Sequence, residues 1–316
     1  MKQTRKFQDL TIGDNYMFGS VMMENDNCRQ LLERVLEMPI SRVEVIKEKS
    51  MIYHPKCKGV RLDVYAKDEN NTHYDVEMQL LKRDALPKRS RYYHSQMDME
   101  LLTSGAKYEN LPNTYVIFIC DFDPFSDGKY RYRFRNVCKE TGKILEDGAE
   151  TIFLNTRGKN PDEVSEELVS FLEFVRAGQD GNFEDFGDTY VTRLQNTIRQ
   201  IKENRGKERQ YMMWQDIIDD AKEEGRQVMI KLLRDMLSPL GTLPDEIIQQ
   251  IDQEKDLDKL SAWVKLAAKA ESLKDFISRM SDKEINKKAI ENFIKAGALD
   301  CLEGNRHQKM VVFGQI

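Results

Sequence analysis

Two carboxylates and an amide occupy alternating positions in two segments whose pattern predicts strands. In the segment GVRLDVYA (59–66), Asp63 lies on the polar side of a period-2 alternation. In YDVEMQL (74–80), the polar side is formed by Asp75, Glu77 and Gln79. Residues two apart in a strand point to the same face, so Glu77 and Gln79 project together, and Asp63 comes close to them if the strands pair.

Such a pair of carboxylates suits a hard divalent cation. Two carboxylates held on rigid strands repel each other unless a cation lies between them, and Mg²⁺ takes one or two carboxylates together with waters and phosphate oxygens. A metal so held lowers the pKa of a bound water and neutralises charge that develops on a phosphodiester. The spacing alone leaves a second interpretation open, in which these are ordinary carboxylates on a solvent-facing strand.

The elements that position these residues form a mixed α/β region over the first 160 residues. The polar turn KDENNTH joins the two segments and predicts an antiparallel hairpin. An earlier helix is predicted after Asn25, ending at Pro39, and a basic helix from Lys88 to Tyr108, with Gly105 near its end. The continuous apolar run TYVIFIC (114–120) predicts a strand at the buried centre of a sheet.

Beyond Pro161 the pattern predicts helices almost throughout. Amphipathic spacing covers 162–177 and 190–236, Pro239 and Pro244 break the run, and shorter helices are expected over 245–270 and 283–296. The long charged helix is suited to pairing in a homodimer, although a solvated helix explains the same pattern.

Composition excludes several classes of protein. The chain has 316 residues, 33% of them charged and 40% hydrophobic, and a formal net charge of −5. No apolar run approaches the roughly 18 residues of a membrane span, and the N-terminus has no apolar core of a signal peptide, so we expect a cytoplasmic protein without membrane contact. The five cysteines are scattered, which favours buried thiols. No P-loop and no GxGxxG occurs, so no nucleotide cofactor is expected.

Basic and aromatic residues follow the predicted hairpin. Lys88, Arg89 and Arg91 lie close together, followed by Tyr92 and, one turn later, Gln96. Arginine, lysine and the tyrosine hydroxyl are natural partners of phosphate, so these five residues are candidates for DNA contacts. A solvated charged face, and a simply exposed glutamine, are the competing interpretations.

The segment VRLDVYAKDENNTHYDVEMQL, followed by RSRYYHSQMDMELLTSGAKYENLPNTYVIFICDFDPF, resembles the Rpn family of recombination-promoting nucleases, often labelled transposases. The resemblance covers about residues 8–157, with a weaker tail to about 275. It implies a restriction-endonuclease-like PD-(D/E)XK core, an α/β fold with a mixed central sheet flanked by helices, here followed by an all-helical C-terminal region.

The resemblance also implies roles for individual residues. Asp63 would be the metal-binding aspartate and Glu77 the second carboxylate, and the backbone carbonyl of Met78 would be a further ligand of Mg²⁺, with Mn²⁺ as a substitute. Gln79 stands where most of the superfamily has a lysine, and its amide would orient the attacking water or hold the phosphate.

Two further carboxylates have a weaker connection to the site. Glu33 on the early helix matches the helix glutamate of many such nucleases, but a surface glutamate explains it equally. Asp14, in the segment GDNYMF, is expected first as a cap and second as a site residue.

The C-terminal segment KDFISRMSDKEINKKAIENFIKAGALDCLEGNRHQKMVV (274–312) resembles the helix-hairpin-helix region of the bacterial DNA polymerase III α subunit. Such a turn binds the DNA backbone through amides around a glycine, here Gly297. The chain is therefore expected to divide into a nuclease-like domain (1–160), a helical region for dimerisation or DNA contacts (161–272) and this segment (273–316). The segment is either a DNA-binding tail or an incidental product of gene fusion.

Together these observations predict a Mg²⁺-dependent endonuclease acting on double-stranded DNA in recombination or mobile elements. The rival interpretation is a catalytically inactive DNA-binding or assembly protein. A third is a replication-associated, polymerase III α-like fragment fused to a nuclease domain.

Overall fold

A computed structural model describes residues 5–51, 59–82, 85–180 and 185–280. Gly297 and the helix expected over 283–296 lie outside the described residues. The strands are β1 (Val43–Met51), β2 (Val60–Asp68), β3 (His73–Gln79), β4 (Thr114–Cys120), β5 (Arg131–Phe134) and β6 (Ala149–Asn155). The helices are α1 (Asn15–Met22), α2 (Asn25–Leu36), α3 (Leu86–Leu101), α4 (Glu166–Asp180), α5 (Thr189–Glu203), α6 (Arg205–Leu237), α7 (Asp245–Gln253), α8 (Leu257–Ala267) and α9 (Leu273–Met280).

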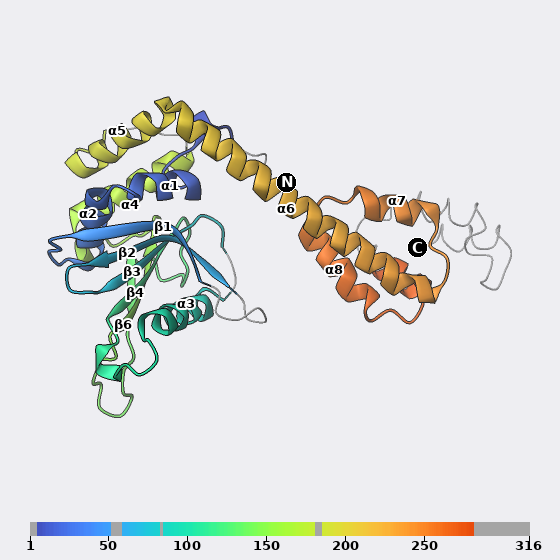
Figure 1. Cartoon of the computed structure of the whole chain (residues 1–316), viewed down its shortest axis with the longest axis horizontal. Coiled ribbons are helices and arrows are strands. Elements are labelled where there is room, and N and C mark those ends of the chain that lie inside the picture. The colour runs from blue at the N-terminus through green and yellow to red at the C-terminus, as the bar shows by residue number, and fades with distance from the viewer. Residues whose placement is uncertain (1–4, 52–58, 83–84, 181–184, 281–316) are drawn as a thin grey trace. The chain divides into compact units, whose positions relative to one another are not determined.

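The strands form one mixed sheet in the order β1-β2-β3-β4-β6-β5 (Figure 1). β1, β2 and β3 are antiparallel, β4 and β6 run parallel to β3, and β5 is antiparallel to β6. The hairpin and the buried central strand expected from the sequence are confirmed. β4 is apolar along its length because parallel strands of this kind are covered on both faces.

The turn between β2 and β3 is fixed by Asp68. Its Oδ1 accepts hydrogen bonds from the backbone N–H groups of Asn70 and Thr72, at 2.9 and 2.8 Å. Its Oδ2 accepts from the hydroxyl of Tyr74 at 2.7 Å. Asn71 adopts φ 62°, a left-handed conformation that asparagine tolerates. This turn sets the register that brings Asp63 opposite Glu77.

Helices cover both faces of the sheet. α3 packs on one face, and α1, α2, α4 and α5 form a layer on the other (Figure 1). On the α3 side, Glu77 of β3, Phe118 of β4 and Phe153 of β6 lie in one row of paired positions. The basic helix expected from Lys88 to Tyr108 is α3, which ends earlier, at Leu101, before Gly105 with φ 85°.

The helical spacing expected over 190–236 is divided between two helices, α5 and α6. Asn204 separates them with an extended backbone (φ −85°, ψ 103°), and its Oδ1 accepts from the N–H groups of Gly206 and Lys207, the second and third residues of α6. A side chain that caps the next helix satisfies N–H groups that a continuous helix would bond internally.

The described chain divides into two compact units, Arg5–Met212 and the part from Met213 onward. The second unit contains most of α6 and the helices α7, α8 and α9. Its core includes the fully buried Leu233, Leu260 and Phe276. The helix expected over 245–270 is broken at Asp256, whose side chain caps α8. The division at residues 160 and 272 stays a prediction.

Two simpler expectations concern membranes and cysteines. Among the described residues, no helix is both long and apolar enough to cross a membrane. Within the same residues Cys28 and Cys120 are buried free thiols and Cys138 is an exposed one.

Candidate functional site

Asp63 and Glu77 are joined across the β2–β3 hairpin. The backbone N–H of Asp63 donates to Glu77 Oε1 at 3.0 Å. Asp63 Oδ2 accepts from the backbone N–H of Met78 at 3.3 Å and from the amide of Asn15, the first residue of α1, at 3.0 Å. Glu77 is only 2% exposed. The two carboxylates therefore lie together on a rigid and largely buried hairpin.

Arg89 of α3 places a positive charge on this site. Its guanidinium donates to Glu77 Oε2 at 2.5 Å and to the amide oxygen of Gln79 at 2.9 Å. Its Nε donates to the hydroxyl of Tyr93 at 2.6 Å, and the group lies over the rings of Tyr93 and Phe118. Gln79 in turn donates to the carbonyl of Leu81 at 2.6 Å. Arg89, predicted as a DNA contact, points into the carboxylate cluster, and its contact with DNA stays a prediction.

Burial and mutual repulsion raise the pKa values of the carboxyl groups. Burial raises the pKa of Glu77 to about 8, and the charge of Asp63 adds to this shift. Burial also raises the pKa of Asp63, against the opposing effect of its hydrogen bonds. Such shifts are typical of groups that must exchange protons or bind a cation.

Asp75 is a third carboxylate at this site that the sequence did not assign. It lies two residues before Glu77 on the same face, is fully buried, and its carboxyl group lies beside that of Glu77. Burial, followed by the charges of Glu77 and Asp63, raises its pKa well above the ordinary value. The alternation of β3 placed Asp75 on this face, but only the packing of α3 shows that the face is buried. Asn15 was also missed, although its neighbour Asp14 was considered.

The other residues predicted to contact DNA differ in their exposure along α3. Lys88 and Arg91 are exposed, as phosphate contacts require. Tyr92 is half-buried and packs against the core, while Tyr93 is fully part of it. Gln96 is 6% exposed and has no described contact with the carboxylates.

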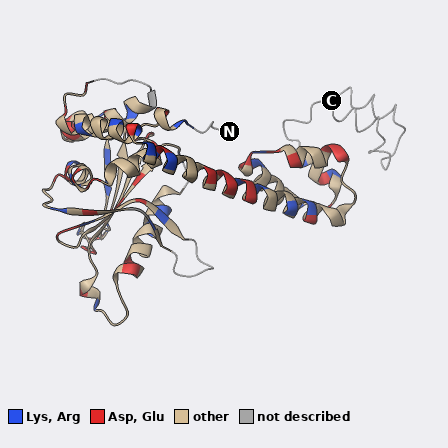
Figure 2. Ribbon diagram, turned by 45° about the horizontal axis from the view of Figure 1, so that its top comes forward, with Lys and Arg blue, Asp and Glu red and all other residues tan. Residues whose placement is uncertain are grey.

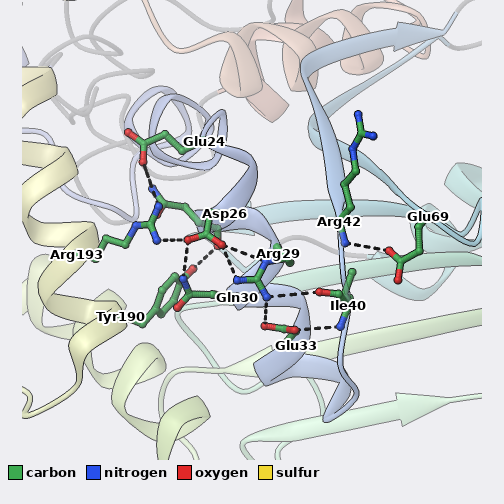
Figure 3. Close-up of polar contacts among 11 residues, drawn as sticks. Glu24, Asp26, Arg29, Gln30, Glu33, Ile40, Arg42, Glu69, Tyr190 and Arg193 are labelled. Atoms are coloured by element: carbon green, nitrogen blue, oxygen red, sulfur yellow. Dashed lines mark hydrogen bonds and ion pairs between the residues drawn. The ribbon is translucent and has the colours of Figure 1, made fainter.

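Glu33 and Asp14 have structural contacts. Glu33 accepts hydrogen bonds from Arg29 at 2.8 Å and from the backbone N–H of Ile40 at 3.0 Å, and both contacts are drawn in Figure 3. Asp14 accepts from the N–H of Thr11 at 2.8 Å and from Arg5 at 2.9 Å. Neither has a described contact with Asp63 or Glu77, so Glu33 stabilises the end of α2 and Asp14 stabilises a turn.

The donor set fits a cation that keeps most of its waters. In the part of the chain that the structure describes, no three side chains of His, Cys, Asp or Glu are grouped so as to hold a metal ion. Asp63 and Glu77 offer two carboxylates, and the carbonyl of Met78 would be a third oxygen. Mg²⁺ is commonly bound through only one or two carboxylates, with water and phosphate completing its shell.

A carboxylate-bearing hairpin in a mixed sheet flanked by helices defines a nuclease domain of the PD-(D/E)XK type. The chain belongs to the family described as PD-(D/E)XK nuclease family transposase, whose model matches residues 15–224. A helix-hairpin-helix motif matches residues 248–309, which begin in α7 and run beyond the described residues. No curated protein and no solved structure matches the chain.

Proposed function

We propose that this protein is a Mg²⁺-dependent endonuclease that cuts double-stranded DNA during recombination or the movement of genetic elements. The contact between Asp63 and Glu77 on a buried hairpin is the observation that carries the proposal. Burying two carboxylates side by side costs free energy unless they serve a cation or a proton. Membership of a nuclease family supports the same conclusion.

In this mechanism the chain's own residues hold the reacting groups. Asp63, Glu77 and the carbonyl of Met78 would hold Mg²⁺, or Mn²⁺ in its place, and such a cation would supply an activated water and neutralise charge on the phosphate. Gln79 orients the water or the phosphate through its amide. Arg89 supplies the positive charge that Gln79 lacks. Hydrolysis would proceed by in-line attack of water at phosphorus, without a covalent enzyme intermediate.

Other parts of the chain support binding of DNA. Lys88 and Arg91 are exposed on α3 and suited to phosphate, with Tyr92 between core and surface. The helix-hairpin-helix match supports further contacts with the DNA backbone, which turns of this kind bind through amides. We place the protein in the cytoplasm, where its thiols stay reduced.

A homodimer formed through α6 is part of the proposal. Figure 2 shows that charged residues recur along the ribbon of this helix, and between them lie the exposed apolar residues Met213, Ile217, Val228 and Leu232. Apolar residues exposed at helical spacing are suited to pairing with a second helix. Light scattering on the whole chain and on an Ile217→Lys variant measures whether this pairing occurs.

Plasmid cleavage tests the enzyme proposal. Supercoiled DNA is incubated with the protein and about 5 mM Mg²⁺, a level suited to a site with few protein ligands, and in parallel with EDTA. Asp63→Ala is compared with Asp162→Ala, an exposed aspartate outside the site. Nicking or linearisation that needs Mg²⁺ and Asp63, but not Asp162, supports the nuclease. Binding of DNA without cleavage supports the inactive DNA-binding protein instead.

A further inference from the structure

A pocket of about 490 Å³ lies between α3 and the β5 edge of the sheet. We call it the α3–β5 pocket and define it by six of its lining residues, Arg91, Asp98, Phe125, Phe134, Arg135 and Phe153. One wall is a stripe of α3 running from Pro87 to Asp98 at intervals of three and four residues, which places these side chains on a single side of the helix. The opposite wall consists of the end of β5 with the two residues that follow it, Phe125 from the segment before β5, and residues of β6.

Three phenylalanine rings form the apolar part of this pocket. The ring centroid of Phe125 lies 5.0 Å from that of Phe134 and 5.1 Å from that of Phe153. Phe134 is 45% exposed, which is unusual for a ring packed on two others. An aromatic face left open to solvent in a pocket is a stacking surface for a planar ligand.

The polar residues of the α3–β5 pocket favour an anionic ligand. Arg91 is exposed, and Arg135, whose Nε donates to Glu150 at 2.5 Å, keeps 44% of its side chain exposed. Asp98 is half-buried, and burial raises the pKa of its carboxyl group. Two arginines and one carboxyl group beside aromatic rings suit a ring with hydrogen-bonding edges that carries a phosphate. That combination is a nucleotide.

The floor of the pocket is neutral. Both ring nitrogens of His94 are engaged, with the hydroxyls of Thr114 and Thr151 at 2.8 and 3.1 Å. Burial lowers the pKa of His94 to about 4, so its ring carries no charge near neutral pH. The phosphate of a bound nucleotide is therefore attracted to the arginines of the walls, and the base stacks on the phenylalanine rings.

The pocket and the carboxylate site share one face of the sheet. Glu77 is paired with Phe118, and Phe118 with Phe153, whose rings stack at 5.3 Å. Neighbouring strands are about 4.8 Å apart, so β6 lies roughly 10 Å from β3. α3 contributes to both places, with Arg89 at Glu77 and Arg91 at the pocket. One DNA strand can reach both within a few nucleotides.

We propose that the α3–β5 pocket binds an unpaired base of the DNA strand whose phosphate lies at Asp63 and Glu77. This inference rests on the proposed function and narrows its substrate, because a base can enter the pocket only where it has left the helical stack. The preferred substrate is then DNA with an unpaired nucleotide close to the cut, as in a single-stranded end, a flap or a locally opened duplex.

Binding of a single strand with and without bases tests the proposal. Fluorescence anisotropy of the full chain in EDTA, which prevents cleavage, measures the affinity for a labelled oligothymidylate and for an abasic strand of equal length. The native protein is expected to bind the strand with bases about tenfold more tightly, the size of one stacking contact. Phe134→Leu and Phe134→Ala remove the ring and should abolish this preference. Tyr108→Ala, which removes an aromatic side chain that is 85% exposed and outside the pocket, should leave it unchanged.

The outcomes separate this inference from the nuclease proposal. Equal affinity for the two strands, or a preference unchanged in Phe134→Leu, overturns the pocket even if Asp63-dependent cleavage is found. A preference that depends on Phe134 supports the pocket even if no metal-dependent cleavage occurs, in which case the nuclease proposal fails alone. Thermal melts identify any variant that has lost its fold, and the leucine variant keeps the apolar packing against Phe125.

Discussion

Arg89 brings a fixed positive charge to a site that has a glutamine where most of its superfamily has a lysine. The guanidinium reaches Glu77 and Gln79 together and is held by Tyr93. A planar guanidinium with several donors can bond a carboxylate and an amide at once, whereas a lysine ammonium acts as a point charge. Arg89 of α3 can therefore stabilise a phosphate, although its charge comes from a helix and not from the strand position that Gln79 occupies.

Two substitutions of Arg89 should distinguish the effect of its positive charge on cleavage from the effect of its hydrogen-bond geometry. We expect Arg89→Gln to lower kcat for DNA cleavage about 100-fold, as loss of one group that stabilises developing charge does. Arg89→Lys should recover part of this loss, because it keeps the charge but not the paired hydrogen bonds. Single-turnover cleavage at saturating DNA measures both variants, with Lys107→Gln, an exposed lysine outside the site, as the control. Equal rates for Arg89→Gln and the native protein would assign Arg89 to folding alone.

The raised pKa of Glu77 predicts how metal binding depends on pH. With a pKa of about 8, the carboxyl group of Glu77 is protonated below pH 8 and must lose its proton before it binds a cation. Affinity for Mn²⁺ should therefore rise with pH up to about 8, by close to tenfold per unit, and then level off. Calorimetry in buffers of different ionisation enthalpy should show release of a proton on binding. Glu77→Gln should bind more weakly and without this release, and an affinity independent of pH between 6 and 8 would contradict the assignment.

The raised pKa of Glu77 also makes the stability of the folded chain depend on pH. Glu77 has a folded-state pKa above its unfolded value, so the folded chain binds the proton more tightly, and stability falls as pH rises from about 4.5 to about 8. Without added metal, the chain loses stability in this pH range because the buried carboxyl group ionises with no bound cation to compensate its charge.

Three residues of the site followed from the sequence and three did not. The period of two in the hairpin placed Asp63, Glu77 and Gln79 together, because side-chain direction in a strand is set by the backbone. Asn15 and Arg89 reach the site from α1 and α3, and only packing of those helices brings them there. The role of Asp75 depends on the burial of a strand face whose composition had also suited a solvent-facing strand.

At the scale of elements, the sheet was more predictable than the helix boundaries. The hairpin and β4 were predicted because turn residues and hydrophobic runs are local signals. The breaks at Asn204 and Asp256 were missed because each capping residue lies within a pattern of helical spacing that continues on both sides. Local capping by a side chain overrides such a pattern.

Gly225 gives a test of α6 as an independent element. A Cβ built at Gly225 meets nothing within 4 Å, so alanine fits without strain. Gly225→Ala should stabilise the helix by about 1 kcal/mol, because glycine costs that much in a helix interior. Thermal unfolding followed by circular dichroism measures this change. Gly158→Ala is the contrasting variant, since its Cβ would lie 2.3 Å from the ring of Tyr130 and should destabilise the sheet unit. A destabilised Gly225→Ala variant would show that the glycine serves a contact or bend.

At the scale of the whole molecule, catalysis and much of DNA binding are assigned to different units. Asp63, Glu77 and Arg89 lie within Arg5–Met212, which has its own hydrophobic core. The helix-hairpin-helix match lies entirely in the second unit, which has a separate core. Each unit therefore has the packing needed to fold without the other.

A chain ending at Glu224, where the nuclease-family match ends, should separate these roles. We expect it to cleave saturating DNA at a kcat within about threefold of the full chain, because the site is intact, while its KM rises roughly tenfold from lost phosphate contacts. Its affinity should also depend less steeply on salt, since fewer counterions are released when fewer phosphates are neutralised. Anisotropy at several salt concentrations, together with steady-state cleavage, measures both effects. Unchanged KM and salt dependence would show that the C-terminal segment is an incidental fusion, whereas loss of kcat in a folded protein would place part of the catalytic machinery beyond Glu224.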